Sequence, residues 1–138
     1  MPTSADLLLD TSAAISLVTP TAPSHEALLE RTRGLTLGLA GHAVFETYSV
    51  LTRLPGELRL SSTGARAVID ANFPGSVFLT PRESDRALAV LSGAGIAGGS
   101  VYDGLVELAA ATAGIPLLSC DRRAQSTYAT LSVTVEVV

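Results

Sequence analysis

Short apolar runs alternate along the chain with segments whose apolar residues recur at the period of a helix. The runs predict strands at 7–9, 35–37, 77–80, 115–119 and 133–138. The helical patterns cover 13–18, 24–33, 41–54, 61–71, 82–94, 101–113 and 121–128. Strands separated by helices require crossover connections, which favour parallel pairing. The pattern therefore predicts a three-layer α/β/α fold with a central, mainly parallel sheet.

Length and composition place this fold in one domain, residues 1–138. The chain is 47% hydrophobic with a mean hydropathy of +0.41, which suits a sheet covered on both faces. No uninterrupted apolar run reaches the roughly 18 residues of a membrane span. The N-terminal segment lacks the basic region of a signal peptide. A single cysteine, Cys120, excludes an internal disulfide and fits a reducing compartment, so we expect a cytoplasmic protein.

Carboxylates stand where the ends of the predicted strands would meet. Asp10 and Asp121 each follow an apolar strand, and Asp103 opens the alanine-rich helix at 101–113. Each has an alternative interpretation: Asp10 and Asp121 could cap helices, and Asp103 could act on the helix dipole. In parallel sheets, however, ligands bind beyond the carboxyl ends of the strands. Capping does not account for three acids at that one edge.

Two glutamates in predicted helices are further candidates for this site. Glu46 lies at the margin of the apolar face of helix 41–54, where it is either solvated or directed at a site. Glu107 lies one turn beyond Asp103. It could assist the site, but we expect it to face solvent.

Clustered carboxylates repel one another and favour a bound cation. Oxygen ligands of this kind suit Mg²⁺ or Mn²⁺, which can bind phosphate oxygens and activate water. The net charge of −4, with nine arginines and no lysine, does not by itself indicate nucleic-acid binding. Walker, GxSxG, HExxH and CxxC motifs are absent from the sequence. We interpret His25 and His42 as surface residues and Cys120 as a core residue.

Four short segments together resemble the PIN domain family, and in particular the VapC toxins of VapBC toxin–antitoxin modules. The segments are Leu8–Ala13 (LLDTSA), Glu46–Pro55 (ETYSVLTRLP), Tyr102–Asp103, and Leu117–Arg123 (LLSCDRR). Each motif is short, but their order and spacing extend over nearly the whole chain. The resemblance implies a PIN fold and a metal-dependent endoribonuclease. It further implies an RNA substrate, a VapB-like antitoxin and a homodimer.

The resemblance also implies roles for individual residues. Asp10, Asp103 and Asp121 would bind Mg²⁺ or Mn²⁺, with Glu46 as a further ligand or a base that orients water. Ser119, and Thr11 or Ser12, would hold a carboxylate or a water. Arg53, Arg122 and Arg123 are candidates for phosphate contact, although the last two could equally be solvated charges. Many relatives carry a further acid or Asn where this chain has Ala124 and Gln125, so a second metal would be held weakly.

Two other functions fit parts of this pattern. A catalytically weak PIN module would act by binding RNA or a protein, but the intact acidic set argues against it. A phosphatase would also place an acid after the first strand. Its commonest form has a second Asp two residues later, where this chain has Ser12.

Overall fold

The computed structural model describes residues 4–131 and 135–138. Four strands form one parallel sheet in the order β2-β1-β3-β4. The strands are β1 (Leu7–Leu9), β2 (Leu37–Leu39), β3 (Leu117–Ser119) and β4 (Val135–Val137). The α-helices are α1 (Thr11–Val18), α2 (His25–Thr32), α3 (Ala43–Leu51), α4 (Ser62–Asn72), α5 (Pro81–Gly93), α6 (Ser100–Ala113) and α7 (Gln125–Thr130). Two 3₁₀ turns, η1 (Gly56–Leu58) and η2 (Arg122–Ala124), precede α4 and α7.

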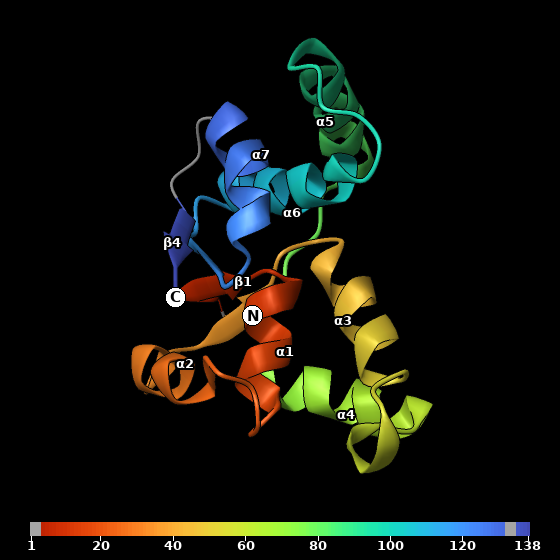
Figure 1. Cartoon of the computed structure of the whole chain (residues 1–138). Coiled ribbons are helices and arrows are strands. Elements are labelled where there is room, and N and C mark those ends of the chain that lie inside the picture. The colour runs from red at the N-terminus through yellow and green to blue at the C-terminus, as the bar shows by residue number, and fades with distance from the viewer. Residues whose placement is uncertain (1–3, 132–134) are drawn as a thin grey trace.

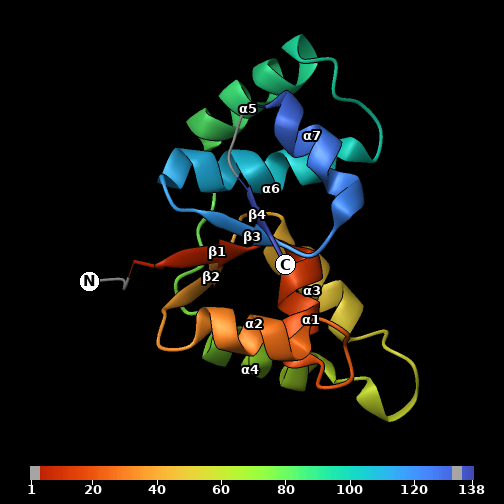
Figure 2. The same ribbon diagram turned by 60° about the vertical axis from the view of Figure 1, so that its left-hand side comes forward.

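The helices cover the sheet from both sides. Helices α1, α2 and α4 lie on one side of the sheet, with α3 beside them, and α5, α6 and α7 lie on the other (Figures 1 and 2). Each of the strands β1, β2 and β3 has three residues, and all of them are buried, as expected for strands covered on both faces. The three-layer α/β/α architecture predicted from the sequence is thereby confirmed.

Several predicted boundaries were wrong. The second strand lies at Leu37–Leu39 rather than at 35–37, because this register buries Leu37 and Leu39 beside Leu7 and Leu9 of β1. The predicted strand at 77–80 makes only one bridge, between Val77 and Ala40. Its last residues instead lead into α5, which the Thr80–Glu83 capping box starts.

The carboxyl-terminal segments also differ from the prediction. Helix 121–128 is divided into η2 and α7. The last strand is observed at Val135–Val137, whereas residues 133 and 134 of the predicted strand lie outside the described part of the chain. In the described ranges, no helix combines the length and the apolar character needed to cross a bilayer.

Gly38 allows two backbone segments to approach closely beside the sheet. A Cβ atom at this position would lie 2.2 Å from the carbonyl oxygen of Gly75. Backbone cannot rotate away as a side chain can, so β2 would have to shift against β1. We expect Gly38→Ala to lower the free energy of unfolding by about 2 kcal/mol or more, the range of overpacking in a core. Chemical denaturation of Gly38→Ala measures this.

Gly93 at the end of α5 provides the matched control. A Cβ atom there meets nothing within 4 Å, and alanine is the better helix former. Gly93→Ala should therefore be neutral or stabilising. Equal stability of the two variants would show that the close approach at Gly38 costs nothing to relieve.

Candidate active site

The parallel pairing of β1 and β3 brings two carboxylates to one edge of the sheet. Leu9 pairs with Leu118, so the residues that follow both strands emerge side by side. Asp10 comes directly after β1, and Asp121 follows β3 after one intervening residue. The sequence order along each strand is therefore sufficient to place these two acids together.

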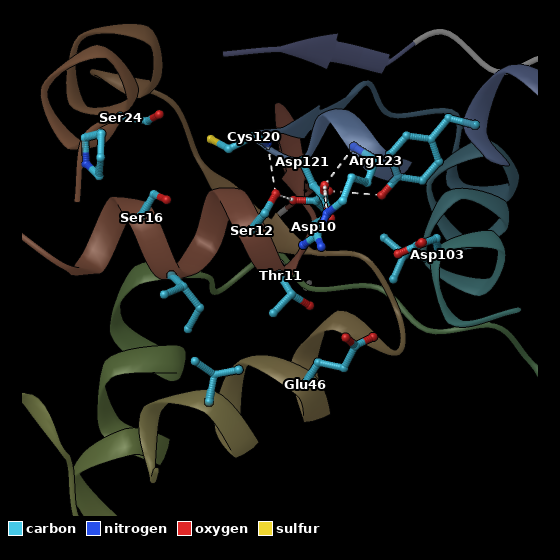
Figure 3. A pocket seen from close by; sticks show the side chains of 15 residues that line it. Asp10, Thr11, Ser12, Ser16, Ser24, Glu46, Asp103, Cys120, Asp121 and Arg123 are labelled. Atoms are coloured by element: carbon cyan, nitrogen blue, oxygen red, sulfur yellow. Dashed lines mark hydrogen bonds and ion pairs between the residues drawn. The ribbon is translucent and has the colours of Figure 1, made fainter. Parts of the chain in front are cut away.

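Two helices contribute the remaining acids. Asp103 lies in the first turn of α6 and Glu46 in the first turn of α3. Figure 3 shows their side chains directed into the same space as Asp10 and Asp121. All four line one cavity of about 530 Å³. The structure thus brings together the four acids that the sequence singled out.

Asp10 combines both roles proposed from the sequence. Its side chain is 4% exposed, and its Oδ1 accepts hydrogen bonds from the Ala13 amide (3.0 Å) and the Ser12 hydroxyl (2.6 Å). These bonds cap α1. The Oδ2 atom accepts a third bond from the Tyr128 hydroxyl at 3.0 Å. Capping therefore fixes the orientation of this carboxylate at the cavity, and the two interpretations do not compete.

Serine hydroxyls hold the ends of β1 and β3 together. Ser12 Oγ accepts a hydrogen bond from the Cys120 amide at 2.9 Å. Ser119 Oγ lies 3.4 Å from Ser12 Oγ and accepts from the Asp121 amide at 3.1 Å. Ser119 thus positions the backbone of Asp121. Of the two residues proposed to support Asp10, Ser12 bonds to it, whereas the buried hydroxyl of Thr11 has no partner among the described residues.

Tyr128 was missed by the sequence analysis. It lies in α7, is buried, and contacts Asp10 from the opposite layer of the fold. The hydrogen bond spans 118 residues of sequence, and no local pattern marks such a pairing. Burial and the neighbouring charge of Asp10 raise the pKa of Tyr128, so this hydroxyl keeps its proton and acts as a donor to Asp10.

The cavity is electrostatically unfavourable for its own carboxylates. Burial raises the pKa of Asp103, and the charges of Asp121 and Asp10 raise it further. Burial also raises the pKa of Glu46, against a lowering effect of His42. His42 Nε2 lies 3.6 Å from Glu46 Oε1, and the His42 side chain is partly exposed, so His42 is a surface residue beside the site. A bound cation would relieve this repulsion.

The three candidate arginines differ in position. Arg123 lines the cavity, and its Nε lies 3.6 Å from Asp121 Oδ1. All three arginines are exposed, but Arg53 and Arg122 are not among the residues that line the cavity. Arg123 is therefore the one of the three whose position suits contact with a phosphate in the cavity.

Glu107 corrects an expectation from the sequence. We had favoured a solvent-facing side chain, but its exposed fraction is 0%. Neither carboxylate oxygen has a hydrogen-bond partner among the described residues. Burial raises the pKa of Glu107 to about 7. The period of a helix gives the side of a residue relative to its neighbours, and it could not show how α6 packs against α5 and α7.

The donor set fits a hard divalent cation, although the site is not preformed. Four carboxylates line one cavity, where burial and the charge of Asp10 raise the pKa of Asp103 and of Glu46, and Mg²⁺ or Mn²⁺ prefers such oxygen ligands. Within residues 4–131 and 135–138, no three acidic, histidine or cysteine side chains already lie close enough to surround one ion. Asp10 is held by hydrogen bonds, so binding would require the other carboxylates to move toward it.

Comparison with known protein families places the chain in one of them. The model of the PIN domain matches residues 7–130. The chain belongs to the PIN domain family.

Two relatives of similar length are ribonucleases of the VapC type. The chain is 41% identical to the ribonuclease VapC27 of Mycobacterium tuberculosis over 131 residues, which cover 95% of this chain and 96% of the relative. It is 39% identical to the ribonuclease VapC40 of the same species, over 94% of this chain and 96% of that one. The resemblance to VapC proteins inferred from four short motifs is thereby confirmed.

Solved structures support the fold independently. M. tuberculosis VapC20, a toxin that cleaves the sarcin–ricin loop, aligns with a TM-score of 0.65 at 17% identity, covering 87% of this chain and 93% of that one. PAE2754 from Pyrobaculum aerophilum aligns with a TM-score of 0.59 at 20% identity, covering 91% and 87%. At these identities the likeness concerns the fold alone.

Proposed function

We propose that this protein is a metal-dependent endoribonuclease of the VapC type, the toxin of a toxin–antitoxin module. The observation that carries the proposal is the convergence of Asp10, Glu46, Asp103 and Asp121 on one cavity. The similarity to VapC ribonucleases over nearly the full length supplies the substrate class. The catalytically weak alternative has no comparable support, because every acid of the set is present and faces the cavity.

Asp10, Asp103 and Asp121 would hold Mg²⁺ or Mn²⁺. When bound, the metal supplies positive charge that lowers the pKa of water and stabilises the leaving oxygen. The departure at Ala124 and Gln125 supports one tightly held ion rather than two, because neither residue offers a carboxylate.

Other residues of the site would activate the water, neutralise charge on the phosphate and position Asp10. Glu46 has a raised pKa and contacts His42. Glu46 therefore accepts the proton of the attacking water, and His42 orients the Glu46 carboxylate. The oxygen of that water forms a bond to phosphorus as the bond to the leaving ribose oxygen breaks. Arg123 neutralises charge on the non-bridging oxygens. Tyr128 and Ser12 hold Asp10 in place.

The test of this proposal is cleavage of RNA by the purified protein in Mn²⁺ or Mg²⁺, with and without a chelator. We expect metal-dependent cleavage that the chelator abolishes. RNA that binds and stays intact would identify a binding module instead.

Tyr128→Phe tests the support of Asp10 by the opposite layer. Removing the hydroxyl frees one side of the Asp10 carboxylate, and losing an outer partner of a ligand typically costs about 10- to 100-fold in metal affinity or activity. We therefore expect about a ten-fold loss in Mn²⁺ affinity by calorimetry and a parallel loss of cleavage. Tyr48→Phe, at an exposed tyrosine outside this cavity, is the control. Unchanged Mn²⁺ affinity in Tyr128→Phe would show that Ser12 and Ala13 suffice.

We further propose that the protein binds a VapB-like antitoxin and forms a homodimer. An apolar groove of about 780 Å³ runs between α3 and α4 and includes Phe45, Ile69 and Phe73. It would accept an apolar segment of a VapB-like antitoxin. The exposed Leu88 and Val90 of α5 offer a surface for a homodimer. Sedimentation of the chain alone and with the product of the adjacent gene tests both, and a monomer that forms no complex would contradict them.

A further inference from the structure

Two aromatic rings form an exposed stack beside the carboxylate cavity. Tyr102, in the first turn of α6, stacks on His42, which directly precedes α3, with ring centroids 4.9 Å apart and planes inclined by 21°. Tyr102 remains 50% exposed although His42 covers part of it. A large ring left open to solvent next to a reaction centre can receive another flat group.

Both ring-bearing residues are neighbours of acids of the site. Tyr102 directly precedes Asp103, and His42 lies 3.6 Å from Glu46 through its Nε2. The stack is therefore fixed between the two helices that supply these carboxylates. Its distance from the reacting phosphate is set by the same backbone that places the acids.

The charges of the cavity favour an uncharged contact with RNA. Four carboxylates and a single arginine, Arg123, are among its lining residues. Phosphates flanking the reacting one would gain little from this surface. The faces of nucleobases carry no net charge, and aromatic side chains bind unpaired bases by stacking in a sequence-tolerant manner.

We infer that the Tyr102–His42 pair is a stacking platform for an unpaired nucleobase next to the cleaved phosphodiester. The inference rests on the proposed ribonuclease function and makes it narrower. It assigns the enzyme to RNA whose bases are unstacked at the cleavage site, and it makes Tyr102 a residue that positions substrate.

The absence of tryptophan from the sequence permits a direct binding test. Tyr102→Trp would introduce the single tryptophan, in an Asp10→Asn background that keeps the RNA intact. The probe is a mixed-sequence single-stranded RNA of about twelve nucleotides in Mg²⁺, compared with its duplex, a length within the site sizes of single-strand binding modules. Leu58→Trp in η1, beyond the far end of α3, is the control at a position that is 43% exposed.

We expect the single strand to quench the fluorescence of the tryptophan introduced at position 102 in a saturable manner. The duplex should cause little quenching there, and the tryptophan introduced at position 58 should respond little to either RNA. Equal quenching at both positions, or none at position 102, would overturn the platform.

Cleavage kinetics provide the second measurement. Tyr102→Ala should raise KM about ten-fold, within the range of one lost base stack, with kcat little changed. Tyr102→Phe, which keeps the ring, should restore the wild-type KM. An unchanged KM in Tyr102→Ala, or a changed oligomeric state in sedimentation, would assign the ring to another role and overturn the inference. If the wild type cleaves no RNA, the proposed function itself fails, whereas cleavage that is indifferent to Tyr102 refutes the platform alone.

Discussion

Asp103→Asn is expected to reduce RNA cleavage by about 100-fold or more without destabilising the fold. The magnitude is that of removing one group that stabilises the charge of a transition state, about 100-fold. Asp103 has a raised pKa because of burial and the charges of Asp121 and Asp10. At neutral pH the ionised form therefore destabilises the metal-free protein, and the neutral amide relieves this repulsion.

Thermal unfolding separates this account from a purely structural role. Without metal, Asp103→Asn should melt at or above the wild-type temperature, and it should lose most of the Mn²⁺-induced rise in Tm. Asp10→Asn should also lose cleavage, since asparagine still caps α1 but no longer supplies a charge. Asp85→Asn, an exposed acid on α5, is the control. Wild-type cleavage by both site variants would leave Asp10 with only its role as a helix cap and Asp103 with only its interaction with the helix dipole.

Glu107→Leu is expected to raise the free energy of unfolding by up to about 3 kcal/mol at a pH of about 8. The value follows from a pKa of about 7 in the folded protein against 4.5 for an ordinary glutamate, at about 1.4 kcal/mol per unit. The folded state binds more protons than the unfolded state between these two pKa values. Stability of the wild type should therefore fall as pH rises from about 4.5 through 7.

Denaturation of the wild type and two variants between about pH 4 and about pH 9 checks this expectation. Glu107→Leu fills the site with an apolar group of similar size, and its advantage should shrink toward about pH 5. Glu107→Gln keeps a polar group without the charge and should show the same loss of pH dependence with a smaller gain. A wild-type profile that is flat between about pH 5 and about pH 8 would indicate that the carboxylate has access to solvent.

The acids of the site could be predicted because they follow from local sequence and sheet topology. Asp10 and Asp121 each follow an apolar run, and parallel pairing brings the ends of such runs to one edge of the sheet. Glu46 could be assigned to the site because the segment around it resembles a motif of the family. The lengths of the short strands were harder, because which leucines enter the sheet depends on pairing with distant partners, as for Leu37 and Leu39.

The contacts between layers could not be predicted. Tyr128 reaches Asp10 across the sheet, and His42 meets both Glu46 and Tyr102 because α3 and α6 converge. A single helix gives the side on which each of these residues lies, but not the element that packs against it. The same limit explains Glu107, whose burial depends on the packing of neighbouring elements around α6.

Crystals of the wild type soaked in Mn²⁺ test the central claim most directly, because anomalous scattering locates manganese without assumptions about the protein. The account predicts a manganese peak in the cavity within coordination distance of Asp10, Asp103 and Asp121, with the last two carboxylates drawn toward the ion. The peak should be absent from Asp103→Asn crystals soaked in the same way. A cavity without manganese in the wild type, or manganese bound only elsewhere on the surface, would contradict the account.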